Sequence, residues 1–205
     1  MNKIIAILFF TAAIIFAVTY PIKPNVDTLD SAFYDHLSDI QEDTTLAFQD
    51  YKAKKVVYVI VHCIASDPTK KRWTPAMLKT FFTTPVKKGG RGWTKYGYNE
   101  YIDYSGNLWE LTPIDCNEYV DYHELTNNAS GYNSISFAIS LEGGVEYKNG
   151  KIVSKDNFSE IQKQMLKSRL RAFKTKWPWV KIIPHNSVSQ KDCPVIDLDQ
   201  ILKEL

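Results

Sequence analysis

Two histidines and a cysteine are the residues of this 205-residue chain best suited to hold a metal ion. His62 and His185 each follow a run rich in β-branched side chains, and Cys193 comes eight residues after His185. Two imidazoles and one thiolate favour zinc, and three protein ligands leave the fourth tetrahedral position for water. The set therefore predicts a catalytic site with one Zn²⁺ ion.

Spacing alone leaves other interpretations open. A histidine after a strand is often only a hydrogen-bonded residue, and a cysteine in an exported protein is often half of a disulfide. In an extended strand Cys63 points away from His62, which favours packing in the core. Cys63 and Cys116 could instead pair in an oxidising compartment, although nothing in their spacing shows that they meet.

Four segments with strand character would position these side chains. Residues 56–61 form a continuous apolar run, typical of a strand buried on both faces. Residues 133–144 and 179–185 predict two more strands. Residues 96–113 alternate around a turn at residues 105–107, which predicts a hairpin.

Three helices are expected among these strands. Thr74 and Pro75 are a start signal for the first helix, and the last lies near residues 197–205. Asn157 and Glu160 fit a capping box for the second helix. Its apolar residues cover about half of its circumference: Phe158, Ile161, Met165, Leu166, Leu170 and Phe173. The order predicts an α/β fold, a single domain with a central mixed β-sheet flanked by helices.

The N-terminal segment has the features of a targeting signal. Lys3 precedes an apolar stretch at residues 4–18, which is shorter than the roughly 20 residues of a membrane-spanning helix. We interpret residues 1–19 as a signal peptide or N-terminal anchor, 20–52 as an acidic linker or helical extension, and 53–205 as the domain. The protein is therefore expected to be exported, periplasmic or secreted, and membrane-anchored if the apolar segment is not cleaved.

Charge excludes one class of partner. The formal net charge is +2, and residues 1–52 hold three basic and seven acidic groups, which leaves 22 basic and 16 acidic groups in the domain. This mild excess suits a polar or anionic polymer but is too small to indicate nucleic acid. We expect no nucleic-acid partner, and we expect a monomer.

Four sequence blocks occur in an order that resembles one known family. They are "VHC", "GYNEYIDYSGNLWE", "HELTNNASGYNSISFAISLEGG" and "PHNSVSQKDCP". The chain resembles the zinc-dependent N-acetylmuramoyl-L-alanine amidases of the type 2 family, which includes the peptidoglycan recognition proteins and the phage lysozymes that are amidases. The similarity covers residues 54–200, essentially the whole expected domain.

The resemblance implies roles for seven residues and a fold of the amidase and peptidoglycan recognition protein type. It implies that His62, His185 and Cys193 are the zinc ligands. It also implies that Tyr98 and Lys191 are catalytic residues, and that His123 and Tyr132 line the substrate groove.

The general base stays open. Unperturbed tyrosine and lysine have pKa values of about 10, which is high for a base at neutral pH. Lys191 has a clearer task, because its ammonium can face the negative charge that develops on a substrate carbonyl. Glu100 would share a face with Tyr98 only in a regular strand, and a solvated place in the hairpin is favoured for it.

Two functions follow from the resemblance. The first is a peptidoglycan hydrolase that cleaves the amide between N-acetylmuramic acid and L-alanine of the stem peptide. The second is a peptidoglycan-binding recognition module without catalysis. Cys193 and Tyr98 favour the enzyme, because the non-catalytic members of the family typically lack the cysteine ligand.

Overall fold

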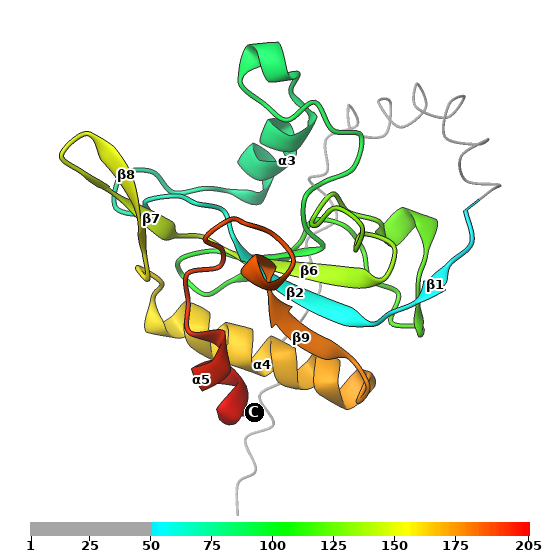
Figure 1. Ribbon diagram of the computed structural model, residues 1–205. Helices are drawn as coiled ribbons and strands as arrows, with labels where there is room; N and C mark the ends of the chain where they lie inside the picture. Colours follow the sequence, from blue (N-terminus) through cyan, green and yellow to red (C-terminus); the bar gives the residue numbers. More distant parts are fainter. Residues whose placement is uncertain (1–50) are drawn as a thin grey trace, which may run out of the picture. The chain divides into compact units, whose positions relative to one another are not determined.

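The computed structural model describes residues 51–205 (Figure 1). Its strands are β1 Lys54–Lys55, β2 Tyr58–Cys63, β3 Glu100–Ile102, β4 Leu108–Glu110, β5 Tyr119–Val120, β6 Ser136–Leu141, β7 Gly144–Lys148, β8 Lys151–Lys155 and β9 Lys181–Pro184. Its α-helices are α3 Pro75–Thr83, α4 Glu160–Lys176 and α5 Leu198–Lys203, with 3₁₀ turns η2 Val86–Lys88, η3 Tyr122–Glu124 and η4 His185–Ser187.

The segment expected at residues 1–19 lies outside the described residues. So does the acidic extension expected at residues 20–52, apart from its last two residues. Within residues 51–205 no helix has the length and apolar character needed to cross a membrane.

The central sheet is mixed, as expected. Its strand order is β4-β3-β6-β2-β9, in which β4 is antiparallel to β3 and the other neighbours are parallel. The expected strand at residues 56–61 lies two residues later, at β2, because pairing with β6 continues through His62 and Cys63. Two small sheets, β1-β5 and β7-β8, were not expected.

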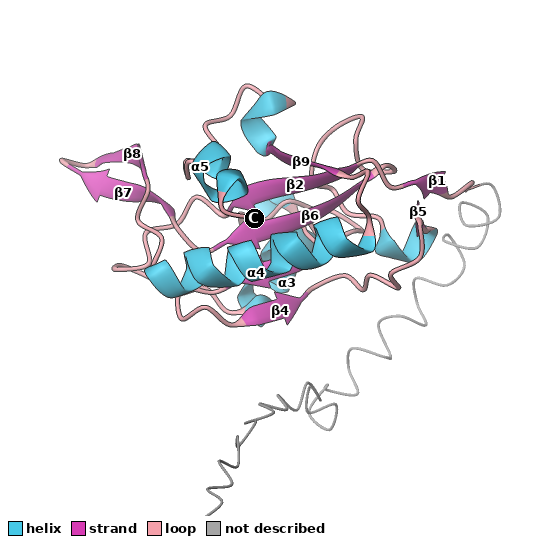
Figure 2. Cartoon of the chain, turned by 90° about the horizontal axis from the view of Figure 1, so that it is seen from below, coloured by secondary structure: helices cyan, strands magenta, loops and turns pink. Residues whose placement is uncertain are grey.

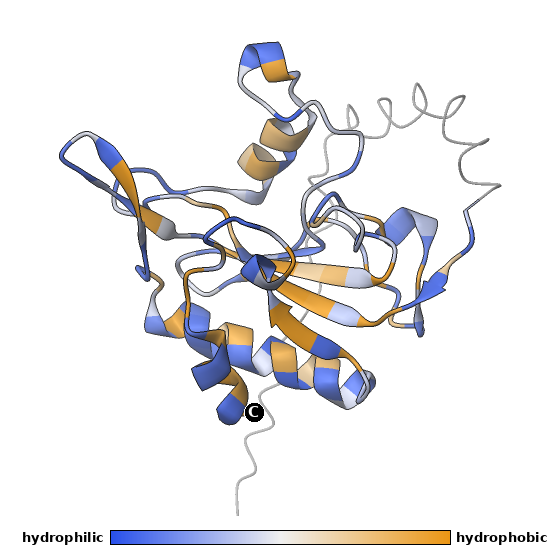
Figure 3. Ribbon diagram, viewed as in Figure 1, coloured by the Kyte–Doolittle hydropathy of each residue, from blue (hydrophilic) through white to orange (hydrophobic). Residues whose placement is uncertain are grey.

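Helices cover both faces of this sheet (Figures 1 and 2). Tyr101 and Ile102 are neighbours in β3, so their side chains point to opposite faces. Tyr101 packs with Leu78 and Phe82 of α3, whereas Ile102 belongs to a larger core with Leu166, Leu170 and other residues of α4. The central strands are largely apolar, as their orange colour in Figure 3 shows. The sheet therefore has an α4 face and an α3 face.

The helix starts confirm one expected cap, correct another and add a third at α5. Thr74 accepts a hydrogen bond from Met77 N, and Asp197 caps α5. The capping box of α4 is formed by Ser159 and Gln162, so the prediction of Asn157 and Glu160 is wrong. The Asn157 side chain is occupied elsewhere, since its amide bonds the backbone of Gly144 and Val145.

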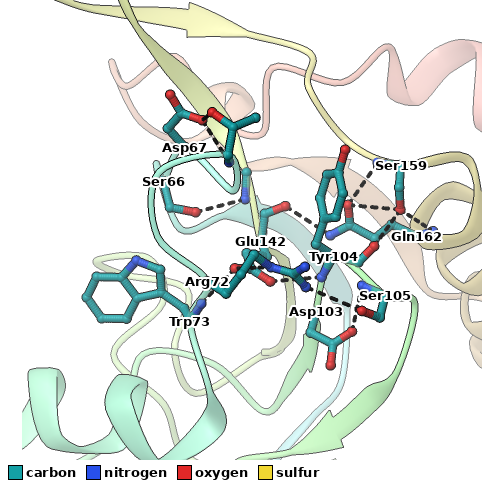
Figure 4. Close-up of polar contacts among 12 residues, drawn as sticks. Ser66, Asp67, Arg72, Trp73, Asp103, Tyr104, Ser105, Glu142, Ser159 and Gln162 are labelled. Carbon is teal, nitrogen blue, oxygen red and sulfur yellow. Dashed lines mark hydrogen bonds and ion pairs between the residues drawn. The ribbon is translucent and has the colours of Figure 1, made fainter.

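A buried carboxylate joins three loops near the end of β6 (Figure 4). Glu142 is fully buried and accepts hydrogen bonds from Arg72 Nε at 3.0 Å, Trp73 N at 2.7 Å and Tyr104 N at 2.8 Å. Buried charge is costly unless it is fully hydrogen-bonded, and these donors meet that requirement. Glu142 thereby fixes the backbone that carries Trp73.

We expect Glu142→Ala to lower the free energy of unfolding by about 3 kcal/mol, because two buried backbone N–H groups lose their acceptor. Arg72→Met should cost about 1.5 kcal/mol, because it removes one charged donor from the fully buried Glu142 carboxylate but leaves both backbone donors in place. Urea unfolding of both variants at one fixed zinc concentration measures the difference. Equal losses would contradict the role given to the backbone donors.

Candidate metal centre and its cleft

Strand register brings the two histidines together. In the parallel pair β2-β9, Val61 lies opposite Pro184, so His62 and His185 both come one residue after this rung. Their ring centroids are 4.3 Å apart. His62 shares the α3 face with Ile60, because side chains alternate along β2. Both rings therefore reach the carboxyl ends of parallel strands, where α/β folds commonly place their sites.

A loop returns the cysteine to the same point. The backbone N–H of Asn186 donates a hydrogen bond to the backbone carbonyl of Cys193 at 2.8 Å, which closes the loop of residues 186–193. Cys193 Sγ lies 3.9 Å from His62 Nδ1. One potential ligand atom from each of His62, His185 and Cys193 lies within 4.8 Å of the others. The structure thus brings together the three residues that the resemblance named as ligands.

The surroundings of the cluster fit a divalent metal ion. His62 is 1% exposed, and within residues 51–205 its Nε2 has no hydrogen-bond partner. Burial, with smaller effects of His185 and Lys191, lowers the pKa of His62 well below its usual range. Burial and Lys191 lower the pKa of His185 in the same way. Both imidazoles are therefore neutral, the form that binds metal, and Nε2 of His62 is a buried nitrogen that the described residues leave without a hydrogen-bond partner.

Cys63 lies beside the cysteine of the cluster. As expected from strand alternation, it packs in the core on the α4 face. Its backbone N–H donates to Cys193 Sγ at 3.3 Å, and the two sulfur atoms are 3.9 Å apart. Cys63 does not pair with Cys116, a possibility that the spacing left open, because Cys63 is buried and Cys116 is an exposed free cysteine. The hydrogen bond with Cys63 and burial raise the pKa of the Cys193 thiol, so they favour its protonated form. Coordination to a cation would favour the thiolate instead.

This proximity predicts a reaction of the metal-free protein. With zinc chelated, diamide should join Cys63 and Cys193, since their sulfur atoms need to approach only from 3.9 Å to about 2.05 Å. Each thiol loses a proton, one S–S bond forms, and the reagent takes up two electrons. Mass spectrometry after alkylation should then find only Cys116 labelled. Labelling of all three cysteines in the oxidised apoprotein would exclude the reaction.

A cleft of about 1110 Å³ opens beside the cluster. One wall comes from α3 and the segment that follows it, and another from the loop of residues 127–133. Its lining includes His62, Trp73, Phe81, Phe82, Arg91, Trp93, Tyr98, Asn127, Asn128, Asn133, Ser154, His185, Lys191, Asp192 and Cys193. Small-molecule sites usually measure about 300–1,000 Å³, so this cleft suits part of a polymer.

Tyr98 and Lys191 both line this cleft. The Tyr98 ring lies 5.2 Å from that of His62 and packs edge-on against Phe82. Burial, followed by the two nearby thiols, raises the pKa of Tyr98, which keeps its hydroxyl neutral and able to donate. Lys191 is exposed, and its positive charge is felt by both histidines. The structure therefore brings both expected catalytic residues to the cluster.

Glu100 lies outside this arrangement, and the expectation that it is solvated is wrong. Strand β3 begins only at Glu100, so no strand alternation relates it to Tyr98. Glu100 is buried, and its carboxylate pairs with Arg169 of α4 at 2.6–2.8 Å. Burial raises the pKa of Glu100, although Arg169 acts in the opposite direction. Its place is structural, on the α4 face of the sheet.

The two expected groove residues do not line the cleft. His123 lies in η3 with its side chain 54% exposed, 3.9 Å from Asp115 Oδ2. The Tyr132 ring packs edge-on against Tyr58. Their contact with substrate stays a prediction. The cleft is lined instead by Asn127 and other residues of the same sequence block, whose run of short polar side chains was the available signal.

Solved structures identify the class of fold. N-acetylmuramoyl-L-alanine amidase LysC from Clostridium intestinale matches with a TM-score of 0.53 at 20% identity, over 75% of this chain and 89% of LysC. Bumblebee PGRP-SA matches with a TM-score of 0.50 at 18% identity, over 76% of this chain and 89% of that protein. At these identities the likeness shows the fold, which is the one shared by amidases and peptidoglycan recognition proteins.

The chain belongs to the N-acetylmuramoyl-L-alanine amidase family, whose model matches residues 52–195. A curated relative, the endolysin of Klebsiella phage KP32, is 29% identical over 108 residues. That alignment spans 53% of this chain and 64% of the endolysin, so the chain covers less than two thirds of this relative's length. The family match covers most of residues 51–205, which the structure describes.

Proposed function

We propose that this protein is a zinc-dependent peptidoglycan hydrolase that cleaves the amide between N-acetylmuramic acid and L-alanine of the stem peptide. One observation supports the metal-dependent form of this activity: His62, His185 and Cys193 come within 4.8 Å of one another at the wall of a long cleft. Zinc held there would supply Lewis acidity, which activates water and polarises an amide carbonyl.

The chain's own residues would do the remaining work. The ammonium of Lys191 stabilises the negative charge that develops on the substrate carbonyl oxygen, a contribution largest in the transition state. The neutral hydroxyl of Tyr98 donates a hydrogen bond at the reacting centre. Phe82 and Trp93 stack at 5.6 Å and form an apolar wall that orients the substrate and limits access of bulk water.

Metal analysis combined with mass spectrometry of digested cell wall tests this proposal. We expect one zinc per chain and two kinds of product together: glycan strands whose N-acetylmuramic acid carries a free lactyl carboxylate, and stem peptides with a new L-alanine amino terminus. Products cleaved between two amino acids of the stem peptide would contradict the proposed bond specificity. Binding without any cleavage by the zinc-loaded protein would instead support the recognition module.

We propose as part of the same function that the protein is exported from the cytoplasm. Action on peptidoglycan requires access to the cell wall, and the apolar stretch of residues 4–18 is suited to export. Cell fractionation is the measurement, and intact protein found only in the cytosol would contradict export.

A further inference from the structure

A hairpin that the catalytic proposal does not use stands away from the central sheet. Strands β7 and β8 form a two-stranded sheet whose base is joined to Ser66 by one bridge at Gly144, and Figures 1 and 2 show them extending beyond the rest of the domain. Their turn is formed by Asn149 and Gly150, both with positive φ of 52° and 74°, the conformation that a tight two-residue hairpin requires. The turn residues therefore hold the hairpin in register.

The register divides the hairpin into two different faces. Val145 lies opposite Ser154, and Tyr147 lies opposite Ile152. Because side chains alternate along a strand, these four residues share one face. Ser154 lines the cleft. The face that starts at the cleft wall therefore continues outward as the Tyr147–Ile152 pair.

This pair is exposed in a way that folding does not explain. Tyr147 is 55% exposed and Ile152 is 63% exposed. In the part of the chain that the structure describes, no aromatic ring packs against Tyr147. The opposite face is charged, with an ion pair between Glu146 and Lys155 at 3.2 Å. An aromatic and an aliphatic side chain paired in solvent beside a cleft mark a contact surface.

The tip of the hairpin adds positive charge. Lys148 and Lys151 lie directly opposite each other, an arrangement that costs stability in a strand pair. Among residues 51–205 no carboxylate lies within ion-pair distance of either lysine. By the same alternation they belong to the face of Glu146 and Val153, so at the tip they border the Tyr147–Ile152 face and are not part of it.

We propose that the Tyr147–Ile152 face of the β7-β8 hairpin binds the glycan strand of peptidoglycan next to the stem peptide being cut. The inference rests on the proposed function. A sugar ring presents C–H groups on its faces, which pack on an aromatic ring, while its hydroxyls can reach the tyrosine oxygen. The hairpin extends the cleft and favours the polymer over a single muramoyl peptide.

The test compares two faces of one hairpin on two substrates. The variants are Tyr147→Ser with Ile152→Ser on the proposed face, and Val153→Ser, 37% exposed, on the opposite face. Co-sedimentation with isolated cell-wall sacculi and hydrolysis of those sacculi should both fall about tenfold for the double variant. Hydrolysis of a short soluble muramoyl peptide should be unchanged, and Val153→Ser should behave as the parent on both.

Several outcomes would overturn the proposal. They are unchanged sedimentation of the double variant with sacculi, an equal loss on the short substrate, or an equal loss in Val153→Ser. Sedimentation of the parent with vesicles of anionic phospholipid, lost in the double variant, would assign the face to a lipid surface instead. A parent protein that sediments with sacculi but cleaves neither substrate would refute the amidase proposal, while the sedimentation comparison still tests the hairpin.

Discussion

Cys193→Ala should abolish both zinc binding and the release of stem peptides from cell wall. The substitution removes the only sulfur among the three proposed ligands and leaves two imidazoles, which are too few to hold the ion in a catalytic geometry. Loss of a residue that merely supports a ligand typically costs 10–100-fold in metal affinity or activity, so loss of a ligand should exceed about 100-fold. Metal content and muropeptide release, measured on the same preparation, report the two effects.

Cys116→Ala is the matched control, because Cys116 is the exposed cysteine of the chain and does not line the cleft. It should keep both zinc and activity. If Cys193→Ala digested purified cell wall as fast as the parent, the ligand assignment would be wrong. If both cysteine variants lost activity but retained zinc, the loss would have to come from the fold, which circular dichroism would reveal.

Lys191→Met should keep the metal and lose turnover by about 10²–10³-fold, the usual effect of removing one donor that stabilises a developing oxyanion. Lys191 lines the cleft but is not one of the ligands. Because the interaction is made mainly in the transition state, kcat and kcat/KM should fall together while KM changes little. Steady-state kinetics on a soluble muramoyl peptide, with metal content measured in parallel, separates this effect from loss of zinc.

Lys181→Met provides the comparison for charge alone, since Lys181 is exposed on β9 and does not line the cleft. Its turnover should equal that of the parent. An unchanged turnover in Lys191→Met would remove the proposed role of Lys191. A rise in KM with unchanged kcat would turn Lys191 into a substrate-binding residue.

The predictions that succeeded depend on local patterns. The run at residues 56–61, the start signal at Thr74 and the alternation around residues 105–107 each report on neighbours along the chain, and the structure has a strand, a helix and a hairpin there. The capping box at α4 failed by two residues, because Asn157 satisfies the backbone of another strand instead of its own helix. A tertiary contact decided between two local alternatives of similar quality.

Glu100 shows where local reasoning ends. Its place in a short alternating hairpin favoured solvent, but the ion-pair partner that explains its burial, Arg169, lies 69 residues away. The β7-β8 hairpin was missed although the sequence carried a signal for it. Residues 145–148 alternate apolar and polar side chains, and Asn149-Gly150 is the dipeptide typical of a two-residue hairpin turn.

By itself the sequence determined the donor chemistry: two imidazoles and a thiol, with a lysine beside them, and strands able to carry the histidines. It also determined the family resemblance, because ordered blocks of residues are a property of the chain. Only the tertiary structure decided that the donors meet, since the parallel register of β2 and β9 and the closure of the loop after His185 bring residues 131 positions apart to within 3.9 Å. Such distances depend on how strands pair, and strand pairing is set by packing of the whole core.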